Sequence, residues 1–270
     1  MTDPTPLRII SSGRTVTGKV RRNNEDNLWS GPIGDAATMP GDCDVEGRTT
    51  YPGFLLAVAD GMGGAKAGEV ASRIAVETLA RSIADRVGDG TGAHGDPADV
   101  GKASVHEANE RILRDGEGDA SREGMGTTLT VAWLVGRHAE LFQVGDSRAY
   151  LFRAGRLEQL TKDQSLVGKL IEDGILSEEE AERVAGRHII LQALGSEEEL
   201  EVVHRRVVLE RDDVLLLCTD GLSGLVRREA MEGAMRKHPV LSDACRGLIE
   251  LAEREGGTDN ITVLLARVQA

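Results

Sequence analysis

Six short apolar runs along the chain have the length and composition of β-strands. They cover residues 54–59, 127–134, 139–144, 148–152, 214–218 and 261–265. Several of them stop or start at an acidic residue: the first ends at Asp60, the third leads to Asp146, and Asp220 closely follows the fifth. The pattern therefore predicts a β-rich domain with carboxylates at the strand ends.

Apolar residues at helical spacing predict helices over 69–87, around 105–112 and over 241–252. The stretches 31–52 and 88–97 are rich in Gly, Asp and Pro, and we expect loops there. The charged stretch 164–200 interrupts the strands and is expected to be a partly helical surface insertion, with Ser177 to Glu180 resembling a helix N-terminus. Strands with two groups of helices predict a layered α/β or α+β domain.

The composition is that of a globular protein and excludes a wholly disordered or fibrous chain. Of 270 residues, 40% are hydrophobic and 29% charged, while aromatic residues are only 3%, so the core must consist of Val, Leu, Ile and Ala. The formal net charge of -13 disfavours nucleic acid as a partner, but clustered carboxylates can bind hard cations.

Three scattered cysteines, Cys43, Cys218 and Cys245, form neither a disulfide framework nor a zinc motif, which favours a reducing compartment. No apolar stretch reaches the ~20 residues of a membrane span, and residues 1–8 lack a signal-peptide core. We therefore expect a soluble, cytoplasmic protein that does not bind membranes.

The aspartates at the strand ends suggest a metal site. A buried strand fixes the carboxylate that follows it, and the glycines after Asp60 and Asp220 allow tight turns and close backbone approach. Carboxylates brought together repel one another unless a divalent cation joins them, and all-oxygen ligands favour magnesium or manganese. Two such ions ~3.5–4 Å apart can activate a bridging water for attack on phosphorus, and Arg21 offers a forked donor for the phosphate.

Each feature also has an ordinary structural explanation. An isolated Asp-Gly pair is usually a turn, Arg21 alone would be a solvated surface charge, and Gly145-Asp146 alone would indicate a β-hairpin. Spacing along the chain does not establish that these residues meet in space.

In combination, the motifs resemble the PPM family of metal-dependent serine/threonine phosphatases, also called protein phosphatase type 2C, in its bacterial branch. Eight segments carry the resemblance in the family's order over nearly the whole chain, and they cover residues 20–26, 58–64, 124–128, 144–150, 160–163, 193–195, 218–222 and 259–262. The resemblance implies one phosphatase domain over 1–270, with its core at about 8–268 and a flap at about 164–200. It implies a four-layer α-β-β-α sandwich of the α+β class, with two central antiparallel sheets flanked by helices.

The resemblance also implies roles for individual residues. Asp60 would bridge two Mn²⁺ or Mg²⁺ ions, with Asp220 and Asp259 on one ion and Glu25 and the Gly61 carbonyl on the other. Asp146 with Asp220 would hold a third, weaker ion. Arg21 would bind the substrate phosphate, and Asp26 would steady metal-bound water from the second shell.

Two positions depart from the family pattern. Met62 stands where eukaryotic relatives carry a histidine proposed as general acid, and a thioether cannot donate that proton. Gln164 stands where many relatives have a histidine, which bears on the conformation of the flap and on substrate preference.

The expected activity is hydrolysis of phosphoserine and phosphothreonine in proteins, opposing a serine/threonine kinase, by a monomer. Two alternatives keep the same residues: a partner-switching phosphatase acting on one small phosphorylated regulator, and a pseudophosphatase that binds metal without turnover. A nucleotide phosphohydrolase is disfavoured because the sequence has no P-loop and no cluster of base-stacking aromatics.

Overall fold

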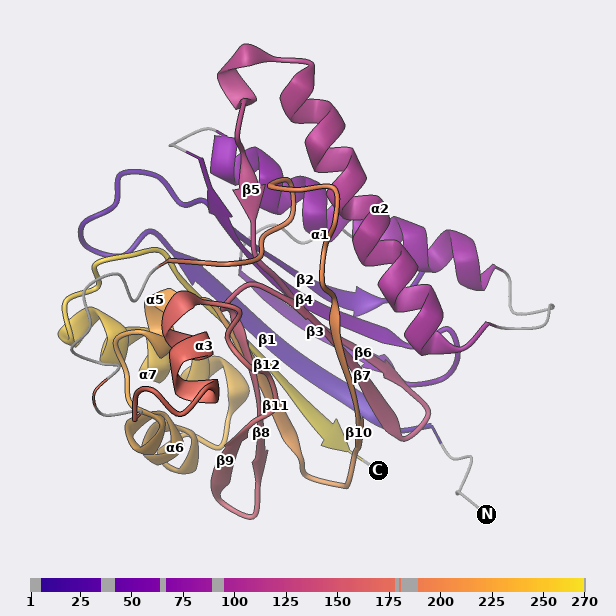
Figure 1. The fold of residues 1–270 in the computed structure, drawn as a ribbon. Coiled ribbons are helices and arrows are strands. Elements are labelled where there is room, and N and C mark those ends of the chain that lie inside the picture. Colours follow the sequence, from indigo (N-terminus) through magenta and orange to yellow (C-terminus); the bar gives the residue numbers. More distant parts are fainter. Residues whose placement is uncertain are drawn as a thin grey trace.

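Two antiparallel sheets form the centre of the computed structural model, which describes residues 6–34, 42–63, 67–88, 95–177, 180 and 189–269 (Figure 1). The first sheet has the strand order β3-β1-β12-β11-β8-β9, and the second has the order β10-β7-β6-β4-β2 with β5 paired to β4. The strands are β1 (Arg8–Val16), β2 (Asp26–Pro32), β3 (Cys43–Arg48), β4 (Phe54–Met62), β5 (Gly126–Thr127), β6 (Leu129–Val135), β7 (His138–Val144), β8 (Arg148–Arg153), β9 (Arg156–Gln159), β10 (Val203–Val208), β11 (Val214–Cys218) and β12 (Ile261–Gln269).

Helices cover the outer face of each sheet. The long helices α1 (Ala67–Val87) and α2 (Pro97–Glu117) lie over the second sheet, and a short 3-10 turn, η1 (Ala120–Arg122), follows α2. The first sheet is covered by α5 (Asp220–Ser223), α6 (Arg228–Lys237) and α7 (Leu241–Arg254). Helix α3 (Leu166–Glu172) lies outside these layers at the front of Figure 1.

The alternation of side chains along the central strands divides the apolar core into three layers. On β4, Leu55, Ala57 and Ala59 face α1 and α2, whereas Phe54, Leu56 and Val58 face the other sheet. The strands of the first sheet alternate in the same way: on β11, Leu215 and Leu217 point between the sheets, and Leu216 packs against the α5–α7 layer. Strands buried on both faces read as continuous apolar runs, which explains why they stand out in the sequence.

The structure confirms the predicted four-layer α-β-β-α sandwich and the three predicted helices, but it corrects three local expectations. The loop expected over 31–52 is wrong in part, because β2 extends to Pro32 and β3 occupies Cys43–Arg48. The single strand expected over 127–134 is interrupted at Thr128. The alternative of a hairpin at Gly145-Asp146 is wrong, because β7 and β8 belong to different sheets and the pair forms a crossover. Only Gly88 and residues 95–97 of the loop expected over 88–97 are described.

In the described part of the chain, no helix combines the length and apolar character that a membrane span requires.

Candidate active site at the ends of the two sheets

The space between the two sheets turns from apolar to polar at one end. Asp60 follows Phe54, Leu56 and Val58 in the alternation of β4, so its side chain continues the row that faces the other sheet. Asp26 starts β2 and is the direct cross-strand partner of Asp60. The row of apolar side chains on β4 that faces the other sheet therefore ends at the Asp60 carboxylate, and the Asp26 carboxylate lies beside it on β2.

Threonines from the opposite sheet hold Asp26. The hydroxyls of Thr219 and Thr262 donate to Asp26 Oδ2 at 2.8 Å and 2.6 Å, and the Thr262 amide donates to the Thr219 hydroxyl at 3.1 Å. Asp26 Oδ1 is buried and accepts no hydrogen bond from a described residue. The pKa of Asp26 is raised to about 7, first by burial and also by the charges of Asp220 and Asp259, against the lowering effect of the two threonines.

Asp60 is the electrostatic centre of the site. Its amide donates to Thr128 Oγ1 at 3.0 Å, and its carbonyl accepts from the Thr127 hydroxyl and the Thr128 amide. These bonds also account for the interruption of the predicted strand at Thr128. Burial first, then the charges of four other carboxylates, raise the pKa of Asp60 well above its ordinary value; the four are Asp26, Asp220, Asp146 and Asp259.

Asp146 and Asp220 lie together on another side of this centre. Asp146 occupies the crossover from β7 to β8, and Asp220 begins α5 directly after β11 and Thr219. The pKa of Asp146 is raised to about 7, first by burial and then by Asp220 and Asp163. Asp146 Oδ1 is buried without a hydrogen bond from a described residue.

Asn260 fixes the segment that carries Glu25. Its side-chain oxygen accepts from the Glu25 amide at 2.8 Å, and its side-chain nitrogen donates to the carbonyls of Thr17 and Asn23 at 3.0 Å and 2.8 Å. The Glu25 carbonyl accepts from the Gly61 amide at 3.2 Å, which ties Glu25 to the residue after Asp60. The pKa of Glu25 is raised by burial, with Arg21 opposing and Asp259 adding to the rise.

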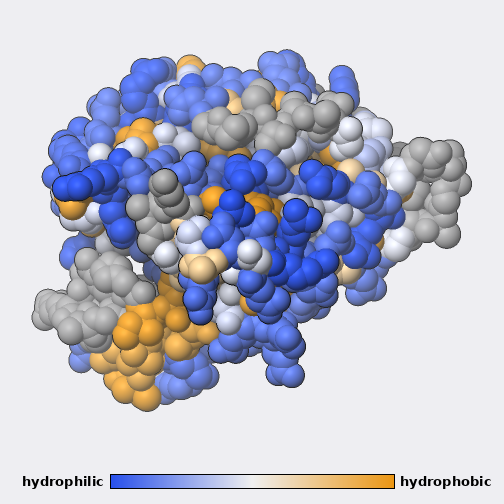
Figure 2. Space-filling model, turned by 90° about the horizontal axis from the view of Figure 1, so that it is seen from above, coloured by the Kyte–Doolittle hydropathy of each residue, from blue (hydrophilic) through white to orange (hydrophobic). Residues whose placement is uncertain are grey.

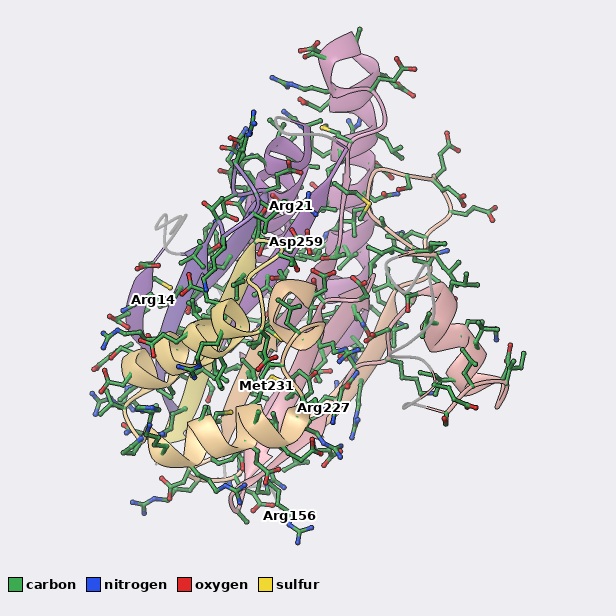
Figure 3. All side chains as sticks on the ribbon, turned by 90° about the vertical axis from the view of Figure 1, so that its left-hand side faces the viewer. Arg14, Arg21, Arg156, Arg227, Met231 and Asp259 are labelled. Carbon is green, nitrogen blue, oxygen red and sulfur yellow. The ribbon has the colours of Figure 1, made fainter. Side chains whose placement is uncertain are left out.

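Arg21 and Asp259, 238 residues apart in sequence, form an ion pair at the same end of the sheets (Figure 3). Arg21 Nη2 donates to Asp259 Oδ2 at 2.7 Å, and about half of the Arg21 side chain remains exposed, at 53%. The hydrogen bond to Asp259, with the charges of Glu25 and Asp60, raises the pKa of the guanidinium. A fork with five donors retains donors for a second anion.

The structure thus gathers the predicted site residues at one end of the sandwich: Arg21, Glu25, Asp26, Asp60, Gly61, Asp146, Asp220 and Asp259. Sequence reasoning assigned no role to Thr128, Thr219, Thr262 or Asn260, which position these residues. The available signal was a threonine at the polar end of an otherwise apolar row, and this signal is weak because threonine is common in strands.

The donor set fits hard divalent cations. It consists of carboxylates, and two buried oxygens, Asp26 Oδ1 and Asp146 Oδ1, lack hydrogen-bond donors among the described residues. As the side chains stand, no group of three or more Asp, Glu, His or Cys residues in the described ranges is arranged so that it could hold a metal ion. Since the raised pKa values of Asp26, Asp60 and Asp146 include mutual repulsion, a cation is what would let the carboxylates approach one another while ionised.

The segment predicted as a flap begins with a link to the Asp146 turn. The Gly145 amide donates to Gln164 Oε1 at 2.7 Å, the Gln164 amide donates back to the Gly145 carbonyl at 3.0 Å, and Gln164 Nε2 donates to the Glu201 carbonyl. At the predicted helix start, Ser177 and Glu180 exchange capping hydrogen bonds; residues 178–179 and 181–188 lie outside the described ranges.

The surface near α3 is more hydrophobic than its surroundings. Figure 2 shows a mostly hydrophilic face whose largest hydrophobic area lies at the lower left, on the side where α3 lies in Figure 1. The exposed large hydrophobic residues of the segment predicted as a flap are Leu166, Ile175, Ile189 and Leu191. This apolar surface is linked through Gln164 to the turn that carries Asp146.

The glycine after Asp220 leaves no room for a side chain, because a Cβ there would overlap the Asn260 carbonyl oxygen. We expect Gly221→Ala to lower the free energy of unfolding by about 1–3 kcal/mol or more, since backbone atoms must shift. The control is Gly233→Ala in α6, where nothing lies within 4 Å of the added Cβ and which should stabilise the protein by about 0.5–1 kcal/mol. Urea denaturation measures both; equal effects would show that the close approach at Gly221 does not constrain the site.

Comparisons with known proteins agree with this architecture. Residues 44–265 match the family described as protein phosphatase 2C. The chain is 38% identical over 263 residues to the serine/threonine protein phosphatase PstP of Mycobacterium tuberculosis, covering 97% of this chain but only 45% of that protein. The chain is also 36% identical to the serine/threonine phosphatase stp of Listeria welshimeri, covering 93% of each.

Solved structures give the same result. A crystal structure of the Mycobacterium tuberculosis serine/threonine phosphatase PstP superposes with a TM-score of 0.82 at 36% identity, covering 98% of this chain and all of that one. A second structure, of the PstP catalytic domain in complex with two manganese ions, has a TM-score of 0.79 at 36% identity over the same shares of the two chains. The fold, the order of the motifs and these similarities agree, and the chain belongs to the protein phosphatase 2C family.

Proposed function

We propose that this chain is a serine/threonine protein phosphatase that uses divalent cations to hydrolyse phosphate monoesters on proteins. The observation that carries the proposal is the set of carboxylates around Asp60, placed at one end of the sheets beside the half-exposed Arg21. The names of the relatives, and the two manganese ions in the PstP complex, support the same chemistry.

Asp60, Asp220, Asp259, Glu25 and the Gly61 carbonyl would hold two cations, and Asp146 with Asp220 would hold a third. Bound Mn²⁺ or Mg²⁺ supplies Lewis-acid stabilisation of the phosphate and lowers the pKa of water. These carboxylates come from five separate segments of the chain. Hydrogen bonds of Thr128, Thr219 and Asn260 fix Asp60, Asp26 and Glu25, respectively. The site is therefore preorganised by main chain and threonines rather than by salt bridges alone.

Arg21 and Asp26 would act on the substrate side. The Arg21 guanidinium already donates to Asp259 and would bind the phosphate with its remaining donors, which places the phosphorus next to the cation site. Asp26 Oδ2 is occupied by two threonines, so Oδ1 would accept the hydrogen bond of the attacking water. Met62 cannot protonate the leaving serine or threonine oxygen, and solvent would supply that proton.

The test is hydrolysis of para-nitrophenyl phosphate and of a phosphothreonine peptide by the purified chain, with and without Mn²⁺ or Mg²⁺. We expect turnover that requires added cation, is abolished by EDTA, and is strongly reduced in Asp220→Asn. Normal hydrolysis by Asp220→Asn with manganese present would overturn the assignment.

The same assays separate the alternatives. Cation binding without turnover of either substrate would identify a pseudophosphatase. Turnover of one intact phosphoprotein but of no phosphopeptide in a panel would identify a partner-switching phosphatase. Turnover of many phosphopeptides supports the general enzyme, whose substrates require a kinase that phosphorylates serine or threonine.

A further inference from the structure

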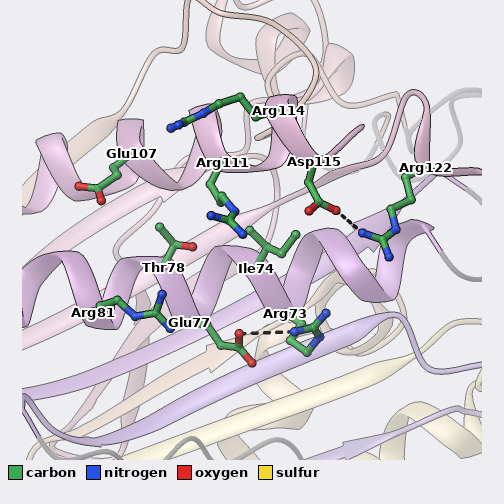
Figure 4. A pocket seen from close by; sticks show the side chains of 10 residues that line it. All are labelled: Arg73, Ile74, Glu77, Thr78, Arg81, Glu107, Arg111, Arg114, Asp115 and Arg122. Carbon is green, nitrogen blue, oxygen red and sulfur yellow. Dashed lines mark hydrogen bonds and ion pairs between the residues drawn. The ribbon is translucent and has the colours of Figure 1, made fainter. Parts of the chain in front are cut away.

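A groove of about 370 Å³ lies between α1 and α2 and shares no lining residue with the carboxylate site (Figure 4). Five arginines line it, and we call it the arginine groove: Arg73, Arg81, Arg111, Arg114 and Arg122. Only three acidic residues share the lining, namely Glu77, Glu107 and Asp115. An excess of two positive charges is unusual on a chain whose net charge is -13.

The acidic residues do not neutralise the whole groove. Arg73 pairs with Glu77 at 3.4 Å and Arg122 with Asp115 at 2.5 Å. Glu107 is occupied by the Ser82 hydroxyl and by Arg86, which lies outside the lining. Arg114 pairs at 3.4 Å with Glu110, which also lies outside the lining. Two arginines remain, Arg81 on α1 and Arg111 on α2.

Arg81 and Arg111 are exposed, and neither forms an ion pair or hydrogen bond with any residue in the described ranges. Figure 4 shows the Arg111 guanidinium reaching from α2 toward Thr78 of α1, while Arg81 rises from α1 farther along the groove. An anion bound between them would break no existing ion pair. Guanidinium forks on two facing helices suit oxyanions carried on a chain.

The groove starts beside the candidate site. Gly68, in the first turn of α1, lies against the Glu25 carboxylate, where a Cβ would overlap Glu25 Oε2. At a rise of ~1.5 Å per residue, Arg73 lies roughly 8 Å and Arg81 roughly 20 Å farther along the helix. At the other edge, Arg122 precedes Gly126, which pairs with Met62. An extended peptide rises ~3.3 Å per residue. The distances along α1 from Gly68 to Arg73 and to Arg81 therefore correspond to about 2 and about 6 peptide residues, or slightly more.

We propose that the arginine groove docks an acidic segment of the phosphoprotein substrate, several residues away from the phosphorylated residue. The proposal rests on the proposed phosphatase function and adds a substrate preference to it. Carboxylates or a second phosphate on that segment would contact Arg81 and Arg111.

The kinetic test compares two phosphothreonine peptides that differ only in three glutamates or three glutamines placed four to seven residues from the phosphothreonine. The variant is Arg81→Gln/Arg111→Gln, and the control Arg48→Gln/Arg156→Gln removes the same charge from exposed arginines outside the groove. We expect the groove variant to lower kcat/KM for the glutamate peptide about fivefold to tenfold relative to the glutamine peptide, through KM. The control should change this ratio less than about twofold. Equal ratios in the two variants would overturn the proposal.

A binding measurement separates this proposal from the proposed function. Fluorescence anisotropy in EDTA measures the affinity of the chain for a labelled peptide that carries either three glutamates or two phosphoserines in the docking segment. Comparing the affinities for the two peptides shows whether the groove binds carboxylates or phosphates. One outcome is that the wild-type chain binds the peptide, the variant Arg81→Gln/Arg111→Gln does not, and the wild type hydrolyses no peptide in the kinetic assay. This outcome would support docking in the arginine groove and overturn the phosphatase assignment. Turnover of both substrates with unchanged binding in the groove variant would overturn the groove alone.

Discussion

Replacing Asp60 by asparagine is expected to lower kcat/KM for a phosphothreonine peptide by at least about a thousandfold at saturating Mn²⁺. The charges of four other carboxylates act on Asp60, which makes it the residue best placed to neutralise and join two cations. Asparagine keeps the shape of the side chain but loses its charge. Steady-state kinetics with Mn²⁺ titrated over a wide range measures the loss.

The matched control is Asp85→Asn, at an exposed position on α1, which should leave kcat/KM within about twofold. The same Asp60→Asn substitution should raise the melting temperature of the cation-free protein at neutral pH, because it removes a carboxyl group whose ionisation burial and the neighbouring carboxylates oppose in the folded state but not in the unfolded state. An Asp60→Asn protein that is inactive and also less stable without cations would point to a folding defect and contradict this explanation.

Stability of the cation-free protein should decrease as the pH rises from about 5 to about 7.5. Asp26, Asp60 and Asp146 have folded-state pKa values raised above the ordinary 3.8, to about 7 for Asp26 and Asp146. The folded state therefore retains protons that the unfolded state has released. This stabilisation is complete at a pH below the unfolded pKa and is lost as the pH rises through the folded pKa.

Other carboxylates do not reverse this trend in that window. The pKa values of Asp96 and Glu107 are lowered by hydrogen bonds, so their stabilising effect grows with pH, but their titration is complete below about pH 5. One retained proton changes the free energy of unfolding by about 1.4 kcal/mol per pH unit, which corresponds to a melting-temperature decrease on the order of 5 °C over the window.

Thermal melts followed by circular dichroism at pH 5, 6, 7 and 7.5, in EDTA and in saturating Mg²⁺, measure the effect. Saturating Mg²⁺ should weaken or reverse the trend, because cations bind the ionised carboxylates of the folded state. A melting temperature in EDTA that stays constant or rises toward pH 7.5 would show that burial and mutual repulsion do not raise the pKa values of these carboxylates in the folded protein.

Most central strands of the fold could be predicted from the sequence, whereas the edge strands and the central strand β1 could not. The sequence of β1, Arg-Ile-Ile-Ser-Ser-Gly-Arg-Thr-Val, is too polar to read as an apolar run. Strands such as β4 and β11 are buried on both faces and read as unbroken apolar runs. β3 and β10 lie at sheet edges and carry charged residues, as in the sequence Val-His-Arg-Arg-Val-Val of β10. Charges on edge strands discourage pairing with other chains, and they also hide the period-2 signal.

The candidate site shows the same limit. Asp60 and Asp220 could be predicted because each closely follows an apolar run of residues and precedes a glycine. The hydrogen bonds from Thr219 and Thr262 to Asp26 join positions at least 193 residues apart, and the Arg21–Asp259 pair joins positions 238 residues apart. Such contacts follow from the packing of two sheets, and nothing in the local sequence around each residue encodes them.

The most direct test of the central claim is electron paramagnetic resonance of the chain titrated with Mn²⁺, read together with the number of ions bound per chain. If Asp60 joins two cations among these carboxylates, the wild-type protein should bind at least two ions and show an exchange-coupled signal that Asp60→Asn abolishes. Only isolated, uncoupled Mn²⁺ in the wild type, or a coupled signal that survives Asp60→Asn, would contradict it.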